Sequence, residues 1–66
     1  MPIEWDNFGP LCRVSRDGMW RIYKVERGMA RWYELKRYIK RDRVWERIDK
    51  GSTFDEMKEA AESYEQ

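Results

Sequence analysis

The 66-residue sequence contains no histidine and a single cysteine, Cys12. Histidine is the commonest general base and metal ligand, so its absence argues against most enzymes and most transition-metal sites. The lone Cys12 cannot form an internal disulfide, which is typical of reducing compartments. No apolar run has the length of a membrane span, and no basic-then-apolar leader follows Met1. We therefore expect a cytoplasmic protein that is not an enzyme, holds no metal or other cofactor, and has no membrane partner.

Aromatic and charged side chains are abundant instead. Four Trp, four Tyr and two Phe in so short a chain indicate a folded core, because aromatic rings bury the most apolar area per residue. A domain of this length is nevertheless marginal, since it buries only about 60% of the surface of its unfolded chain. Charged and hydrophobic residues each make up 41% of the sequence, so each element must be apolar on one face only. We expect a single domain over residues 1–66.

The formal net charge of +1 conceals a segregation of charge along the chain. Residues 1–12 carry two acids and no base, a charge of −2. Residues 13–50 carry 13 Lys and Arg against six acids, a charge of +7, whereas residues 51–66 carry one Lys against five acids, a charge of −4. A basic middle between acidic ends indicates a polyanionic partner. The alternative is that the cations pair with acids across strands, where exposed ion pairs contribute little.

Alternating patterns predict an antiparallel sheet over residues 11–49, after an irregular arm over residues 1–10. Asp17-Gly18 is typical of a tight hairpin turn, and Gly28 marks the next turn. Runs rich in aromatic and β-branched residues give the strands. These strands are expected at residues 11–15, 19–26, 31–40 and 43–49.

The C-terminal segment predicts a helix over residues 52–65. Thr53 and Glu56 have the spacing of a capping box. An apolar stripe follows at spacings of three and four residues: Phe54, Met57, Ala61 and Tyr64. So short a helix needs tertiary contacts, so its stripe is expected to pack on the sheet. The expected fold class is α+β, a three- or four-stranded antiparallel meander with one C-terminal helix packed on one face.

The other face of this sheet is then left without a helix. One alternating set is expected to face the helix: Tyr33, Leu35, Ile39, Val44 and Ile48. In residues 19–26 the inward side stays open, because Trp20 and Ile22 compete with Tyr23 and Val25. Rings that alternate with cations on an open sheet face suit nucleic acid, since guanidinium groups bind phosphates and rings stack. The candidate binding residues are Arg21, Tyr23, Arg31, Trp32, Lys36, Tyr38, Arg43, Trp45 and Arg47.

Three other uses of this face remain open. In the first, an apolar arm of Trp5, Phe8 and Leu11 folds back over it, so that Trp32 and Trp45 form a second small core. In the second, the face mediates self-association, and the protein is a homodimer rather than a monomer. In the third, it binds another protein, because Trp, Tyr and Arg are enriched in interface hot spots.

Short motifs in the second half of the chain resemble known DNA-binding domains. Arg43-Val44-Trp45, Gly51, Thr53-Phe54-Asp55 and Glu59-Ala60-Ala61 are similar to the end of the plant ethylene-response-factor domain. The strand-strand-strand-helix order, opened by Gly18-Met19-Trp20, also resembles the arm-type DNA-binding domain of tyrosine integrases. The resemblance implies a three-stranded sheet that enters the major groove and touches bases and backbone through Arg and Trp.

The sequence thus predicts a small nucleic-acid-binding protein, with duplex DNA favoured, that uses an Arg- and Trp-rich sheet face. Its size resembles that of small phage or mobile-element proteins. The alternative is a protein-interaction module, such as a phage-encoded modulator or inhibitor of a host protein.

Overall fold

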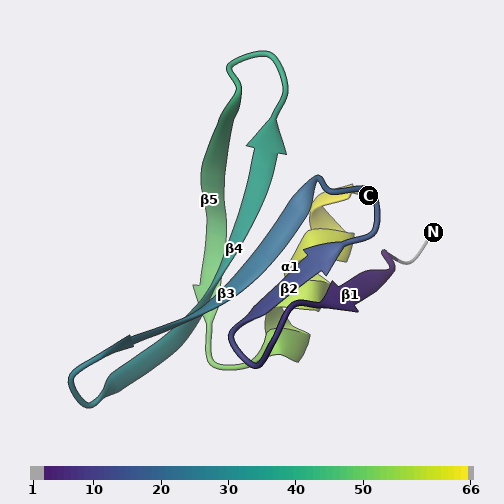
Figure 1. Ribbon diagram of the computed structural model, residues 1–66. Coiled ribbons are helices and arrows are strands. Elements are labelled where there is room, and N and C mark those ends of the chain that lie inside the picture. The colour runs from purple at the N-terminus through teal and green to yellow at the C-terminus, as the bar shows by residue number, and fades with distance from the viewer. Residues whose placement is uncertain (1–2, 66) are drawn as a thin grey trace.

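The computed structural model describes residues 3–65, which form five strands and one helix (Figure 1). Each strand pairs antiparallel with the next along the chain, so the sheet is a meander in the order β1-β2-β3-β4-β5. The elements are β1 Trp5–Asn7, β2 Cys12–Ser15, β3 Trp20–Arg27, β4 Ala30–Ile39, β5 Val44–Gly51 and α1 Phe54–Glu65. The α+β class is as predicted, but the sheet has five strands rather than three or four.

The additional strand, β1, lies within the segment expected to be irregular. Trp5 stands opposite Ser15, and Asn7 stands opposite Arg13. The Arg16 guanidinium ties the two strands further, with Nη atoms 2.8 Å from a Glu4 carboxylate oxygen and 3.2 Å from one of Asp6. A three-residue strand has no alternating pattern of its own and depends on its partner strand, so the sequence pattern did not reveal it.

The position of β1 also bears on whether the N-terminal segment covers the sheet. β1 extends the sheet at its edge, and Trp5 packs against the core that α1 covers. Phe8 and Leu11 remain 63% and 51% exposed. Residues 3–11 therefore do not form an apolar lid over the face opposite the helix.

A buried serine fixes the β2–β3 hairpin. Ser15, which is 2% exposed, donates from its hydroxyl to Asp17 Oδ1 at 2.6 Å and accepts the Trp20 amide at 2.9 Å. The same Asp17 oxygen accepts the Met19 amide at 3.0 Å, and Gly18 supplies the positive φ of 78° that the turn requires. The hydrogen bond from Ser15, assisted by the Met19 amide, lowers the pKa of Asp17 below its ordinary value of 3.8.

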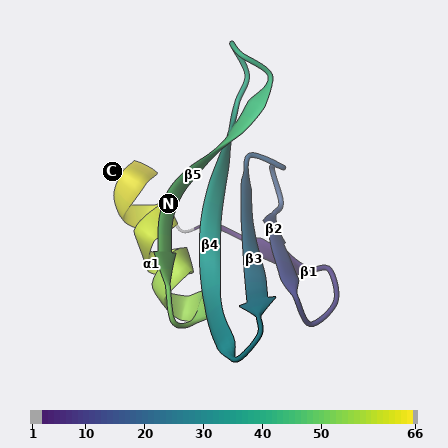
Figure 2. The ribbon, with the colours of Figure 1, turned by 90° about the vertical axis from the view of Figure 1, so that its left-hand side faces the viewer.

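The core lies between the sheet and α1, which covers one side of the sheet (Figure 2). Its fully buried members come from β3, β4 and α1: Trp20, Ile22, Leu35, Met57 and Ala61. Ile22 stands opposite Leu35, so Trp20 and Ile22 occupy the inward side of β3 that the sequence left open. Arg37 closes the edge of this core, with its guanidinium 5.0 Å from the Trp20 ring centroid and 5.2 Å from that of Tyr64.

The helix begins as the capping pattern predicts. Thr53 Oγ1 accepts the Glu56 amide at 3.1 Å, while the Glu56 carboxylate accepts the Ser52 amide at 3.1 Å. Phe54 packs on the ring of Tyr33 at a centroid distance of 4.5 Å. Within residues 3–65 no helix has the length and apolar character needed to cross a membrane.

Two hairpins extend beyond the layer that α1 covers. The β4–β5 hairpin projects at one end of the molecule and the β3–β4 hairpin at the other (Figure 1). Val44, expected to face the helix, lies on the first of these and is 50% exposed. It shares the helix-facing side by register but lies past the end of the helix.

Candidate functional site

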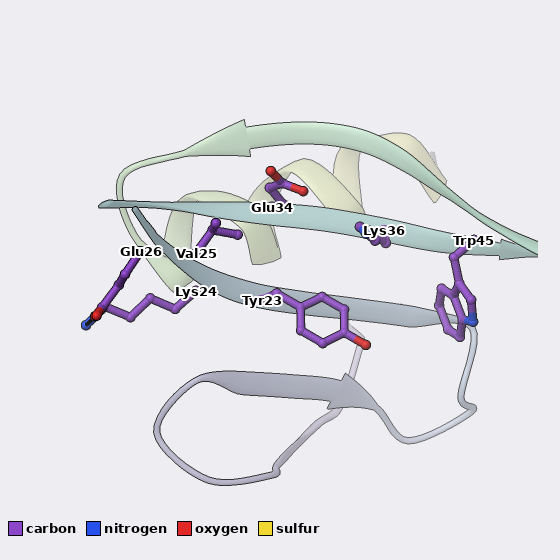
Figure 3. Close-up of a pocket in the computed structure, with 7 residues that line it drawn as sticks. All are labelled: Tyr23, Lys24, Val25, Glu26, Glu34, Lys36 and Trp45. Carbon is purple, nitrogen blue, oxygen red and sulfur yellow. Dashed lines mark ion pairs between the residues drawn. The ribbon is translucent and has the colours of Figure 1, made fainter. Parts of the chain in front are cut away.

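The face of the sheet opposite α1 carries a cluster of cations and rings from β3, β4 and β5. Strand alternation and cross-strand register place on it, among other residues, nine that are charged or aromatic: Arg21, Tyr23, Trp32, Glu34, Lys36, Tyr38, Trp45, Arg47 and Lys50. We call these nine residues the outer face. Figure 3 shows four of them, Tyr23, Glu34, Lys36 and Trp45, along three neighbouring strands. Seven of the nine predicted binding residues lie in this cluster.

Three cations stand directly opposite one another across the outer face. Arg21 on β3 is opposite Lys36 on β4, and Lys36 is opposite Arg47 on β5. Neighbouring strands are about 4.8 Å apart, so this cation row spans about 10 Å. Like charges directly opposite each other destabilise a sheet. In addition, Arg21 Nε is buried without a hydrogen-bond partner in the described part of the chain. The row is therefore an array of positive charge that the neighbouring strands compensate only in part, through Glu34, which lies 3.9 Å from Arg47.

Aromatic rings hold several of these cations in place. The Arg21 guanidinium lies 4.4 Å from the Trp45 ring centroid, and Lys36 Nζ lies 5.7 Å from that of Tyr23. Lys50 Nζ lies 5.8 Å from the Trp32 centroid. Such cation–π contacts restrict the long side chains before any partner arrives. Less conformational entropy is then lost when a partner binds.

Glu34 is the acid at the centre of the outer face. Its side chain is only 16% exposed, and one carboxylate oxygen accepts the indole N–H of Trp32 at 2.7 Å. The same oxygen lies 3.9 Å from an Arg47 Nη. Four cations against this one carboxylate leave the nine residues with a formal charge of +3.

An open hollow of about 440 Å³ lies within this surface (Figure 3). Its walls include Tyr23, Val25, Glu34, Lys36 and Trp45. Trp32 and Trp45 are both half-buried, and the groups that cover their rings belong to the outer face itself. The hollow is thus a shallow, open part of the sheet surface.

Cys12, at the β2 side of this surface, stands opposite Tyr23. Burial raises the pKa of its thiol, and the nearby charges of Arg21 and Arg13 offset part of that effect. Within residues 3–65 no three side chains of the His, Cys, Asp and Glu types lie close enough together to hold a metal ion.

Arg31 and Arg43 are not brought together with the other seven predicted residues. Arg31 is exposed near the β3–β4 turn, opposite Glu26. Arg43 is exposed in the β4–β5 turn, where its φ is 56° and its amide donates to the Ile39 carbonyl at 2.8 Å. The two arginines lie on hairpins at opposite ends of the molecule, so they extend the basic surface rather than belong to its centre.

Lys50 is an outer-face residue that simple alternation misses. Counting by twos from Trp45 and Arg47 gives Asp49, not Lys50. The register of β4 against β5 shifts at Leu35 and Lys36, so Ile48 is an extra residue and Asp49 stands opposite Leu35. This β-bulge returns Lys50 to the outer face, opposite Glu34. A bulge depends on the partner strand and has no signal in the pattern of β5 alone.

Comparisons with protein-family models, curated protein sequences and solved structures find no match to this chain.

Proposed function

We propose that this protein binds nucleic acid through the outer face, with duplex DNA as the favoured form. The observation that supports this best is the cation row formed by Arg21, Lys36 and Arg47. Phosphate oxygens over the row would relieve its internal repulsion, because each cation gains a charge-assisted hydrogen bond.

The distribution of charge over the two sides of the sheet supports the same partner. The outer face carries a formal charge of +3, whereas the acids Asp55, Glu56 and Glu59 are exposed on α1, on the other side of the sheet. A polyanion is therefore attracted more strongly to the outer face than to the exposed side of α1. Lysine and arginine contacts to phosphates supply most sequence-independent affinity for DNA.

The rings favour a duplex over a single strand. Proteins that bind single strands offer open ring faces on which bases stack. In this protein Arg21 lies over Trp45 and Lys50 over Trp32, so cations already occupy the ring faces. A nucleic acid that approaches the outer face therefore meets the cations before the rings. A duplex can bind these cations through its phosphates while the cations stay on the rings.

A salt titration tests the proposal. Binding to a random 20-base-pair duplex, followed by fluorescence anisotropy, should weaken as salt rises, because each phosphate contact releases a counterion. Three contacts predict a slope of log affinity against log salt of about −2.7. Lys36→Gln should reduce the size of this slope by about 0.9 and weaken binding to all sequences alike. Lys58→Gln on α1 is the matched control, because it removes the same charge from the other side of the sheet.

Two results would overturn the proposal. One is no binding below about 100 μM at low salt, which is weaker than ordinary non-specific affinity. The other is an equal effect of the Lys36 and Lys58 substitutions, which would mean that net charge rather than the outer face determines the binding.

A protein partner is the second candidate, and the position of Glu34 favours it. A carboxylate at the centre of the outer face repels phosphates, whereas a protein can offer it a cation or an amide. Arg, Trp and Tyr also dominate the hot spots of protein interfaces. This candidate predicts a stoichiometric complex whose affinity varies little with salt.

A further inference from the structure

The turn between β3 and β4 carries the most exposed large hydrophobic side chain of the described chain, Met29. It is 101% exposed. Gly28 has a φ of 59°. The φ of Met29 is not positive, because Arg43 is the one non-glycine residue with positive φ in the described chain. Positive φ at Gly28 alone is the geometry of a type II′ hairpin turn, with Met29 in its second central position.

Nothing in the geometry of this turn requires a methionine. The first central position needs glycine, but the second is commonly filled by Asn, Asp or Ser, which are well solvated. Met29 therefore departs from the residue preference of this turn, and because it is fully exposed, packing does not compensate for the departure. Such departures tend to mark functional positions. Two exposed arginines, Arg27 and Arg31, flank the turn, and the exposed Glu26 stands opposite Arg31.

The β3–β4 hairpin connects this turn to the outer face. Tyr23 stands opposite Glu34, Val25 opposite Trp32, and Arg27 opposite Ala30. The ribbon continues past the layer covered by α1 (Figure 1). Eight residues separate Arg21 in the cation row from Met29, a distance of about 26 Å along an extended strand. A partner held on the cation row is thus within reach of the tip.

We propose that Met29 is a wedge that enters the minor groove of DNA and partly unstacks one base step, while Arg27 and Arg31 bind along the groove. This inference rests on the proposed function. Minor-groove proteins insert apolar side chains, methionine among them, between base pairs and kink the duplex by at least about 20°. Arginines favour the negative potential of a narrow minor groove. One apolar side chain is too small a patch for stable docking on a protein, but it suffices to separate two base pairs.

The experiment measures bending separately from binding. Donor and acceptor dyes at the two ends of a 30-base-pair duplex report bending as a rise in energy transfer at saturating protein, and anisotropy on the same duplex reports affinity. The variants are Met29→Ser, Met29→Leu and, as the matched control, Leu11→Ser. Leu11 is likewise an exposed apolar residue in a hairpin connection, but it has an arginine on one side only, Arg13, whereas Met29 has one on each side.

We expect the wild-type protein, Met29→Leu and Leu11→Ser to bend the duplex, and Met29→Ser to bind it within about threefold of wild type while losing at least half of the bend. A central mismatch lowers the cost of unstacking. It should therefore strengthen wild-type binding several-fold and leave Met29→Ser almost unchanged.

The outcomes also separate this inference from the proposed function. DNA binding with no bend, or an undiminished bend with Met29→Ser, overturns the wedge while the outer-face proposal stands. Loss of bending with both Met29→Ser and Leu11→Ser overturns it as well, because the effect would not be specific to the tip. Absence of any DNA binding by the wild-type protein overturns both.

Discussion

Replacement of Ser15 by alanine tests the hairpin that places β3 in the sheet. The Ser15 hydroxyl is buried and makes two hydrogen bonds, one to Asp17 Oδ1 and one from the Trp20 amide. Alanine fits the same space but has no hydroxyl. The buried Trp20 amide therefore loses its hydrogen bond to the Ser15 hydroxyl.

The expected loss of stability follows from these two contacts. A buried donor left unsatisfied costs about 1–3 kcal/mol. The bond to Asp17 adds less than a buried ionic hydrogen bond would, because Asp17 is exposed and water replaces the hydroxyl. We expect a total of about 2–3 kcal/mol, against a stability of about 3–10 kcal/mol for a chain of 66 residues.

Urea unfolding, followed by the fluorescence of the four tryptophans, measures this difference. With a slope of about 1 kcal/mol per molar urea for so small a domain, the midpoint should fall by about 2–3 M. The pH dependence gives a second measurement. The pKa of Asp17 is lowered in the folded state, so its stabilising effect is fully present above the unfolded value of 3.8 and disappears as the pH falls through the lower folded value. The difference in the free energy of unfolding between wild type and Ser15→Ala should therefore decrease below about pH 3.8.

Asp17→Asn is the control, because it keeps the Oδ1 acceptor and removes the charge. At neutral pH it should lose the stabilisation that the lowered pKa of Asp17 provides, so its acid transition should be flatter than that of wild type. A loss below about 1 kcal/mol for Ser15→Ala at neutral pH would refute the reasoning, since that is the lower limit for an unsatisfied buried donor. A gap between wild type and Ser15→Ala that widens in acid would contradict the assigned role of Asp17.

Two further predictions concern the site and the helix. Glu34→Gln keeps an acceptor for the Trp32 indole and removes the one carboxylate of the outer face, so DNA affinity measured by anisotropy should rise several-fold. A protein partner that uses this carboxylate should instead bind the variant more weakly. Unchanged DNA affinity would mean that phosphates do not approach Glu34. Thr53→Ala removes the oxygen that accepts the Glu56 amide and should cost about 1 kcal/mol in urea unfolding, whereas Thr53→Ser should cost only a few tenths; equal losses would show that the cap contributes nothing.

The sequence predicts those parts of the fold whose cause is local. Asp17-Gly18 and the pairing of Thr53 with Glu56 contain their own turn and cap chemistry, and both form as expected. The local sequence does not predict β1, because its three residues gain a strand conformation only from pairing with β2. The inward side of β3 was also undecided, because Trp20, Ile22, Tyr23 and Val25 are all apolar enough to face the core, and only the register with β4 separates them.

The same distinction applies to the candidate site. Alternation placed Trp32, Lys36 and Tyr38 on one side of β4, which the structure shows. Alternation does not predict that Lys50 lies on the outer face, because that position depends on the bulge opposite Leu35. Nor does it predict the neighbours of Arg31 and Arg43, because these depend on how far each hairpin extends. The cation row itself required the register of three strands, which no single strand specifies.

The separation of charge between the sheet and the helix also affects how the protein approaches a partner. At physiological ionic strength electrostatic forces decay over about 8 Å, whereas the smallest dimension of the molecule is 21 Å. A polyanion near the outer face therefore experiences the cations and hardly senses the acids of α1 behind them. A chain with a net charge of only +1 can in this way be steered into one orientation during diffusion, and its rate of productive encounter would be that of a much more basic protein.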